Sequence, residues 1–189
     1  MQLIGSHTSP YVRRFRMLVP NETLEFVNID IFSPEGAKIL AENSPARKVP
    51  ILVDGQQRVF ESRVIYQYLT EKTALPPLSW DQHNLLTLID AANDSLVEVL
   101  LSQRSGFDTQ EDKLFFNLQR NRLSAIWPVL ASYVEAGDFA NWDYLSISLF
   151  CLIDWVTFRS LDDLSAYQPL QAFYQWALEQ PLVKETDPR

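Results

Sequence analysis

The sequence contains a single cysteine, Cys151, among its 189 residues, and only two histidines. One cysteine excludes an intrachain disulfide, a CxxC redox pair and a cysteine-rich zinc site. Two histidines leave little for a metal site, and we expect no metal. Cys151 stands among apolar neighbours, which predicts a buried, unreactive thiol.

Long hydrophobic runs are also lacking. No stretch approaches the length of a membrane span, and the N-terminus does not show the basic-then-apolar pattern of a secretory signal. Apolar residues make up 47% of the chain, which is enough for an ordinary core. We therefore expect a cytoplasmic globular protein that does not bind membranes.

Basic residues are too few to support nucleic-acid binding. The formal net charge is −8. Residues 1–79 carry nine Lys and Arg against eight Asp and Glu, whereas residues 80–189 carry seven against sixteen. A phosphate backbone requires a basic protein face, so nucleic acid is not an expected partner. The uneven charge indicates two segments with different roles, of which only the first suits an anion.

The first segment reads as alternating short strands and helices in the order βαβαββα. Strands are expected at 2–5, 24–31, 50–54 and 57–60. Helices are expected after Ser9, over 37–42 and after Ser62, with Ser9 and Ser62 as N-caps. A strand, helix and strand of this length imply a parallel pair with a right-handed crossover, and the hairpin adds antiparallel strands. The pattern predicts a thioredoxin-like domain over residues 1–73.

The second segment reads as all helical. A proline-containing linker at 74–79 precedes it, and apolar residues at helical spacing predict helices over 81–101, 109–133, 146–157 and 168–179 within residues 80–189. The stretch 146–157 is apolar almost all round, which is typical of a central helix. All five tryptophans lie in this segment, and we expect them in its core.

Three short motifs and this domain order resemble the cytosolic glutathione transferases. The motifs are Ser9-Pro10-Tyr11, Lys48-Val49-Pro50-Ile51-Leu52 and Glu61-Ser62. The resemblance covers essentially the whole chain and is nearest to the serine-type bacterial and tau-like members. It implies an α/β plus all-α fold, in which a thioredoxin-like N-terminal domain precedes an all-helical C-terminal domain.

The resemblance also implies site residues. Ser9 would be the catalytic hydroxyl, Lys48 would lie near the glycyl carboxylate of glutathione, and Val49 would pair with the cysteinyl backbone. Glu61 and Ser62 would hold the γ-glutamyl end. Glutathione would be a co-substrate, no metal would be needed, and the protein would be a homodimer.

The residues themselves support several of these roles. Pro50 cannot donate to a sheet ladder, so it is confined to the first position of a strand or to an edge, and the main chain there is left unpaired. Whether the Val49–Pro50 bond is cis is left open by the sequence. As an N-cap, Ser9 accepts a hydrogen bond through its oxygen and keeps its proton for a thiolate. Thr8 is the competing hydroxyl, and His7 is expected to be solvated.

The expected activity is conjugation of glutathione to a small apolar electrophile, as in detoxification. The alternative is a non-catalytic adaptor of the same fold that binds a protein partner in stress or regulation. One departure from the family concerns its N-capping box of Ser or Thr and Asp. Ser146 is followed by Leu149, so we expect only half of that box at the central helix.

Overall fold

The computed structural model describes residues 1–20 and 22–189, which divide into two compact units. One unit consists of Met1–Leu78 together with Pro181–Arg189, and the other consists of Ser79–Gln180. The sequence assigned residues 181–189 to the helical domain, whereas they pack in the first unit. The chain therefore passes between the units twice, after Leu78 and after Gln180.

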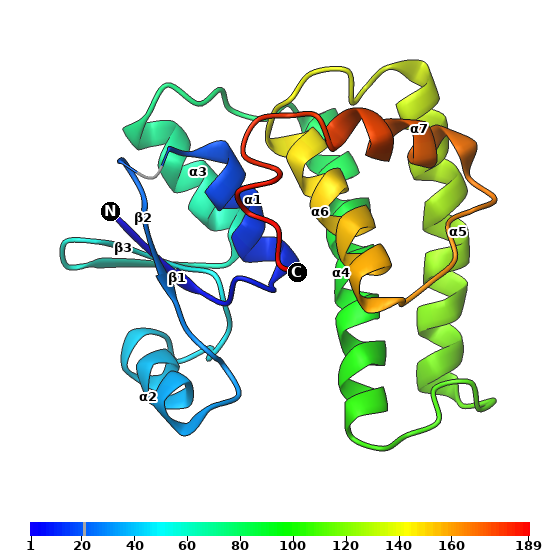
Figure 1. Ribbon diagram of the computed structural model, residues 1–189, viewed down its shortest axis with the longest axis horizontal. Helices are drawn as coiled ribbons and strands as arrows, with labels where there is room; N and C mark the ends of the chain where they lie inside the picture. The colour runs from blue at the N-terminus through cyan, green and yellow to red at the C-terminus, as the bar shows by residue number, and fades with distance from the viewer. Residues whose placement is uncertain (21) are drawn as a thin grey trace. The chain divides into compact units, whose positions relative to one another are not determined.

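The first unit is a four-stranded mixed sheet with three helices (Figure 1). The strand order is β2-β1-β3-β4, in which β1 and β2 are parallel while β3 is antiparallel to both β1 and β4. The order βαβαββα and the thioredoxin-like arrangement are confirmed. The elements are β1 (Gln2–Gly5), α1 (Pro10–Leu18), β2 (Glu25–Asn28), α2 (Pro34–Asn43), β3 (Ile51–Asp54), β4 (Gln57–Phe60) and α3 (Ser62–Lys72).

Two helix starts in the first unit differ from their predictions. Helix α2 begins at Pro34 and not at residue 37, because the Ser33 hydroxyl accepts a hydrogen bond from the Gly36 amide at 3.0 Å. Helix α3 is capped by Glu61 and not by Ser62, because the Glu61 carboxylate accepts from the Arg63 amide. Ser62 is instead the first helical residue.

The strand register brings three loops to one end of the sheet. Ile51, the first residue of β3, lies opposite Ile4 of β1 and opposite Phe60 of β4. Strand β1 ends next to Ile4, and β4 ends at Phe60. Residues 6–9, 49–50 and 61–62 therefore all leave the sheet at this end.

Packing fixes the segments that flank this end of the sheet. Four buried residues form a cluster against which Val49 and Phe60 pack, namely Ile4, Ile29, Leu40 and Ile51. Helix α1 approaches the end of β1 closely, because a Cβ added to Gly5 would lie 2.4 Å from Cγ2 of Val12. Only glycine allows this approach.

The second unit contains α4 (Trp80–Arg104), α5 (Leu114–Ala136), α6 (Tyr144–Arg159) and α7 (Gln168–Ala177). Every residue of α6 from Tyr144 to Val156 is buried, Cys151 included, which confirms a central helix. The prediction that all tryptophans lie in the core is wrong for Trp80 and Trp176, which are 84% and 37% exposed. Within the described residues, no helix combines the length and apolar character needed to cross a bilayer.

The start of α6 corrects the expected capping box. The helix begins at Tyr144, and the Asp143 carboxylate caps it by accepting from the amides of Leu145 at 3.0 Å and Ser146 at 3.1 Å. Ser146 is thus the third helical residue, and its hydroxyl donates to the Phe139 carbonyl. The N-cap residue is therefore Asp143, three residues earlier than the predicted Ser146.

Replacing Asp143 by alanine is expected to destabilise the helical unit by about 1 kcal/mol, because two amides lose their acceptor. This corresponds to a melting temperature about 2–4 °C lower. Trp142 and Trp155 lie near or within α6, so tryptophan fluorescence follows the transition. Asp143→Asn, which keeps an acceptor oxygen, is expected to melt close to the wild type. Equal losses in both variants would contradict the capping role.

Candidate functional site

Ser9 stands at the N-terminus of α1 with its hydroxyl proton uncommitted. Its Oγ accepts from the Val12 amide at 3.4 Å, and its carbonyl accepts from the Arg13 amide at 3.1 Å. Among the described residues, none accepts the Ser9 hydroxyl proton. The side chain is half-buried, so a ligand can reach it. The arrangement leaves one O–H donor at the positive end of a helix.

The hydroxyl of Thr8 is engaged within its own loop. Its Oγ1 lies 3.0 Å from Oγ of Ser6, and its amide donates to the same Ser6 oxygen at 3.4 Å. His7 is exposed, and its amide and ring both contact the Asn28 side chain. Ser6 and Thr8 thus bond to each other, whereas the Ser9 hydroxyl bonds to neither of them and its proton has no partner within the described chain.

The main chain at Val49 is unpaired beside the sheet. The Val49–Pro50 peptide bond is cis. Among the described residues, neither the amide nor the carbonyl of Val49 has a hydrogen-bond partner, and its side chain packs on the core cluster. A side chain held in this way leaves the main chain as the part that can pair with a ligand. Lys48 before it is exposed and forms no ion pair with any described residue.

Glu61 adopts a backbone conformation that L-residues rarely adopt, with φ 72° and ψ 133°. Such a conformation costs on the order of 1–3 kcal/mol and is often found at binding sites. Its carboxylate accepts from the Ser62 hydroxyl at 3.0 Å and from the Arg63 amide at 3.1 and 3.2 Å. These charge-assisted bonds hold the strained residue and fix its carboxylate at the start of α3.

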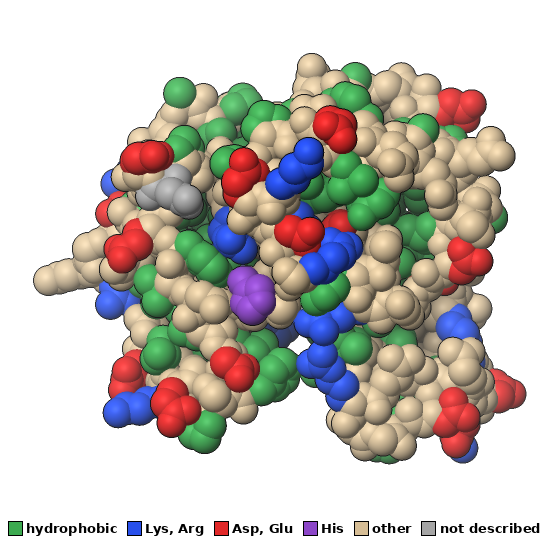
Figure 2. All heavy atoms as spheres, viewed as in Figure 1, with side chains coloured by type: hydrophobic (Ala, Val, Ile, Leu, Met, Phe, Trp, Pro, Cys, Tyr) green, Lys and Arg blue, Asp and Glu red, His purple; other side chains and the backbone are tan. Residues whose placement is uncertain are grey.

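The end of the sheet therefore gathers groups of opposite character. The N-termini of α1 and α3 present amides and the positive ends of two helix dipoles, which suit an anion. The Glu61 carboxylate between β4 and α3 suits a cation. On the face drawn in Figure 2, acidic and basic side chains are interspersed, so no continuous acidic field covers that face. The site can thus receive a ligand that carries both charges.

The structure brings most of the predicted residues together. Ser9, Val49, Pro50, Glu61 and Ser62 all lie at the same end of the sheet, on the three segments that its register aligns. Lys48 directly precedes Val49 in the same segment and is exposed.

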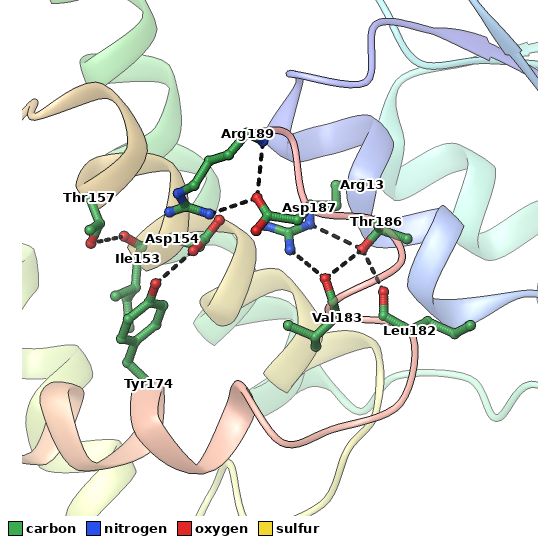
Figure 3. Close-up of polar contacts among 10 residues, drawn as sticks. All are labelled: Arg13, Ile153, Asp154, Thr157, Tyr174, Leu182, Val183, Thr186, Asp187 and Arg189. Atoms are coloured by element: carbon green, nitrogen blue, oxygen red, sulfur yellow. Dashed lines mark hydrogen bonds and ion pairs between the residues drawn. The ribbon is translucent and has the colours of Figure 1, made fainter.

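A separate cavity in the second unit was not predicted. It measures about 610 Å³ and lies between the C-terminal half of α6, residues 160–165 and α7. Two of its polar side chains have partners. Asp162 accepts from Trp127 Nε1 at 2.8 Å, and Tyr174 donates to Asp154 at 2.7 Å (Figure 3). The amide and hydroxyl of Ser165 hold the pKa of Asp163 below its usual value. None of the predicted site residues lines this cavity.

Comparison with known proteins identifies relatives of both units. Residues 3–77 match the family described as "Glutathione S-transferase, N-terminal domain". The chain is 28% identical over 174 residues to the "Uncharacterized GST-like protein YibF" of Escherichia coli (strain K12), which covers 84% of this chain and 83% of that protein.

Two crystal structures share the fold over nearly the entire length. A glutathione transferase family member from Pseudomonas fluorescens Pf-5, solved with bound glutathione, has a TM-score of 0.86 at 24% identity and covers 100% of this chain and 98% of its own. A glutathione S-transferase from Methylobacillus flagellatus, solved with glutathione bound, has a TM-score of 0.84 at 21% identity, with 100% and 99% covered. The chain therefore has the fold of these two glutathione transferase structures, and its residues 3–77 match the model of that family's N-terminal domain.

Proposed function

We propose that this chain is a serine-type glutathione transferase that binds glutathione in its first unit, stabilises the glutathione thiolate through Ser9 and conjugates it to a small apolar electrophile. The observation that carries this proposal is the meeting of the free Ser9 hydroxyl, the unpaired Val49 main chain and the Glu61-Ser62 helix start at one end of the sheet. Relatives of the same fold, solved with glutathione, support it.

The three segments match the three parts of glutathione. The Val49 amide and carbonyl can pair with the cysteinyl main chain as a short strand pair does. The γ-glutamyl end carries both an ammonium and a carboxylate. Glu61 can accept the ammonium, and the N-terminus of α3 at Ser62 can bind the carboxylate. Lys48 can attract the glycyl carboxylate. With the ligand aligned in this way, its thiol would point towards Ser9, on the third of the three segments.

Ser9 would act by hydrogen bonding to the charged form of the thiol. A donated O–H bond stabilises the thiolate more than the thiol, so it lowers the thiol pKa and generates the nucleophile near neutral pH. The ligand thus supplies the sulfur. Ser9 occupies the position from which a cysteine would form a mixed disulfide, and Cys151 is buried in α6, so thiol reduction is not favoured.

Glutathione binding measured by calorimetry tests the first half of the proposal. The wild type is expected to bind, and Glu61→Gln is expected to bind about tenfold more weakly because a charge-assisted bond to the ligand ammonium is lost. Glutamine keeps an oxygen that can cap α3. The matched control is Glu71→Gln, an exposed glutamate of the same helix, which should bind as the wild type does. Absence of binding by the wild type at millimolar glutathione would refute the proposed function.

A further inference from the structure

The segment Pro181–Arg189 is a folded part of the first unit and follows the last helix of the chain. Val183 and Thr186 are only 2% and 5% exposed. Thr186 closes a turn, because its amide and its hydroxyl both donate to the Leu182 carbonyl, at 3.1 and 2.7 Å. The segment therefore has a fixed shape and a buried face of its own.

This buried face receives the side chain of Arg13 from helix α1. Arg13 is 3% exposed, and its Nη2 donates to the Val183 carbonyl at 2.9 Å while its Nε donates to Thr186 Oγ1 at 3.2 Å (Figure 3). A buried guanidinium is tolerated only where its donors are satisfied. Residues separated by 170 positions in sequence are thus joined by directional bonds.

The carboxylate of Asp187, in the same segment, provides a negative charge that favours the guanidinium of Arg13. Burial alone would raise the pKa of Asp187, but hydrogen bonds from the Arg189 amide and guanidinium, together with the charges of Arg189 and Arg13, hold it below its usual value. Asp187 is therefore ionised at neutral pH. Its negative charge favours the buried guanidinium of Arg13.

Arg13 is also tied directly to Ser9. Its amide donates to the Ser9 carbonyl at 3.1 Å, and the Ser9 hydroxyl oxygen accepts from Val12 within the same turn. Ser9 through Arg13 is thus one hydrogen-bonded turn, with the candidate catalytic hydroxyl at one end and an anchored guanidinium at the other. A shift of α1 against residues 181–189 would carry the hydroxyl with it.

We propose that Arg13 is a positioning residue, which sets the place of the Ser9 hydroxyl by anchoring α1 to the Val183 carbonyl and the Thr186 hydroxyl. The inference rests on the proposed function of Ser9. The role does not require Arg13 to touch glutathione, because its Nη2 and Nε donate to Val183 and Thr186. A displacement of about 1 Å at a reacting group can cost roughly 100-fold in rate, so a small shift of α1 is sufficient.

The test measures the pKa of glutathione bound to the full-length protein, by thiolate ultraviolet absorbance against pH, together with kcat and KM. Arg13→Met is expected to raise the bound-thiol pKa and to lower kcat about tenfold with little change in KM. Thr186→Val removes one acceptor and keeps the side-chain shape. It should also raise the bound-thiol pKa and lower kcat, but by smaller amounts. Arg13→Lys, which can still donate to the Val183 carbonyl, should restore part of the loss.

The matched control is Arg58→Met. Arg58 lies in the same unit and donates to the Gly55 carbonyl at 3.1 Å, but it is exposed and pairs with Val53 on the turn side of the β3–β4 hairpin, away from the Ile51–Phe60 pair. In the Arg58→Met protein, the pKa of the bound glutathione thiol and kcat should equal those of the wild type. If Arg13→Met and Thr186→Val only lower the melting temperature and leave the bound-thiol pKa unchanged, the positioning role is wrong. A wild type that does not lower the thiol pKa would overturn the role of Ser9 first, and the inference with it.

Discussion

Replacing Ser9 by alanine is expected to lower kcat for conjugation of a general aromatic electrophile by roughly 100-fold or more, while the dissociation constant for glutathione stays nearly unchanged. Removal of a single hydrogen-bond donor from a charge-stabilising site has costs of this order. Binding is retained because Val49, Glu61 and the start of α3 remain. The bound-thiol pKa should return towards that of free glutathione. Calorimetry and steady-state kinetics measure the two quantities separately.

Thr8→Ala is the natural comparison for this variant. The Thr8 hydroxyl lies against Ser6, so its loss should change kcat by only a few-fold. Ser9→Thr keeps a hydroxyl and an N-cap oxygen, and should retain part of the activity. Should Thr8→Ala abolish conjugation while Ser9→Ala remains active, the assignment of the hydroxyl is reversed.

Replacing Gly36 by alanine is expected to destabilise the first unit by about 2 kcal/mol. A Cβ at Gly36 would lie 1.8 Å from the carbonyl oxygen of Asp30. That oxygen already accepts from the amide and hydroxyl of Ser33, so the backbone cannot yield without losing the cap of α2. Overpacking costs about 3 kcal/mol here, and the better helix propensity of alanine offsets only about 1 kcal/mol.

The unfolding of Gly36→Ala must be followed by circular dichroism and by hydrogen exchange over α2, because all five tryptophans lie in the helical unit. A melting temperature about 4–8 °C below that of the wild type is expected. Gly55→Ala is the control: nothing lies within 4 Å of its Cβ, although φ is +58°, so about 1 kcal/mol is expected from backbone conformation alone. A Gly36→Ala protein as stable as the wild type would contradict the described start of α2.

The order of elements in the first unit was predictable because the residues that begin its helices and form its turns act locally. Pro10 after Ser9, and Asp54-Gly55 between two apolar runs, determine the backbone without help from distant residues. The strands 2–5 and 57–60 accordingly match β1 and β4. The signal for α2 was also present, since Ser33-Pro34 repeats the Ser9-Pro10 pattern.

The caps at Glu61 and Asp143 were missed for different reasons. Asp143 stands three residues before Ser146, so a search for acidic N-caps would have found it. Glu61 has no local signal, because glutamate does not favour a positive φ. Its carboxylate bonds to Ser62 and Arg63, and the bond from the Ile65 amide to its carbonyl, hold it there. Its place in the site could be predicted from the family resemblance, but its conformation could not.

The meeting of the three site segments depends on strand pairing, which single segments do not specify. Once Ile51 is paired with Ile4 and Phe60, the loops around Ser9, Val49 and Glu61 must share one end of the sheet. The packing of residues 181–189 against α1 likewise could not be predicted, because Arg13 and its partners Val183 and Thr186 are 170 and 173 positions apart in the sequence. Contacts of this kind follow from tertiary structure and carry no periodic pattern.

The return of residues 181–189 to the first unit has a consequence for biosynthesis. In a nascent chain, Val183 emerges from the ribosome 170 residues after Arg13, and Thr186 emerges 173 residues after it. The strands and helices of that unit can form while the helical unit is still being made, but the guanidinium of Arg13 must remain hydrated until translation has passed residue 186. Maturation of the Ser9 turn is thus coupled to the synthesis of residues 181–189.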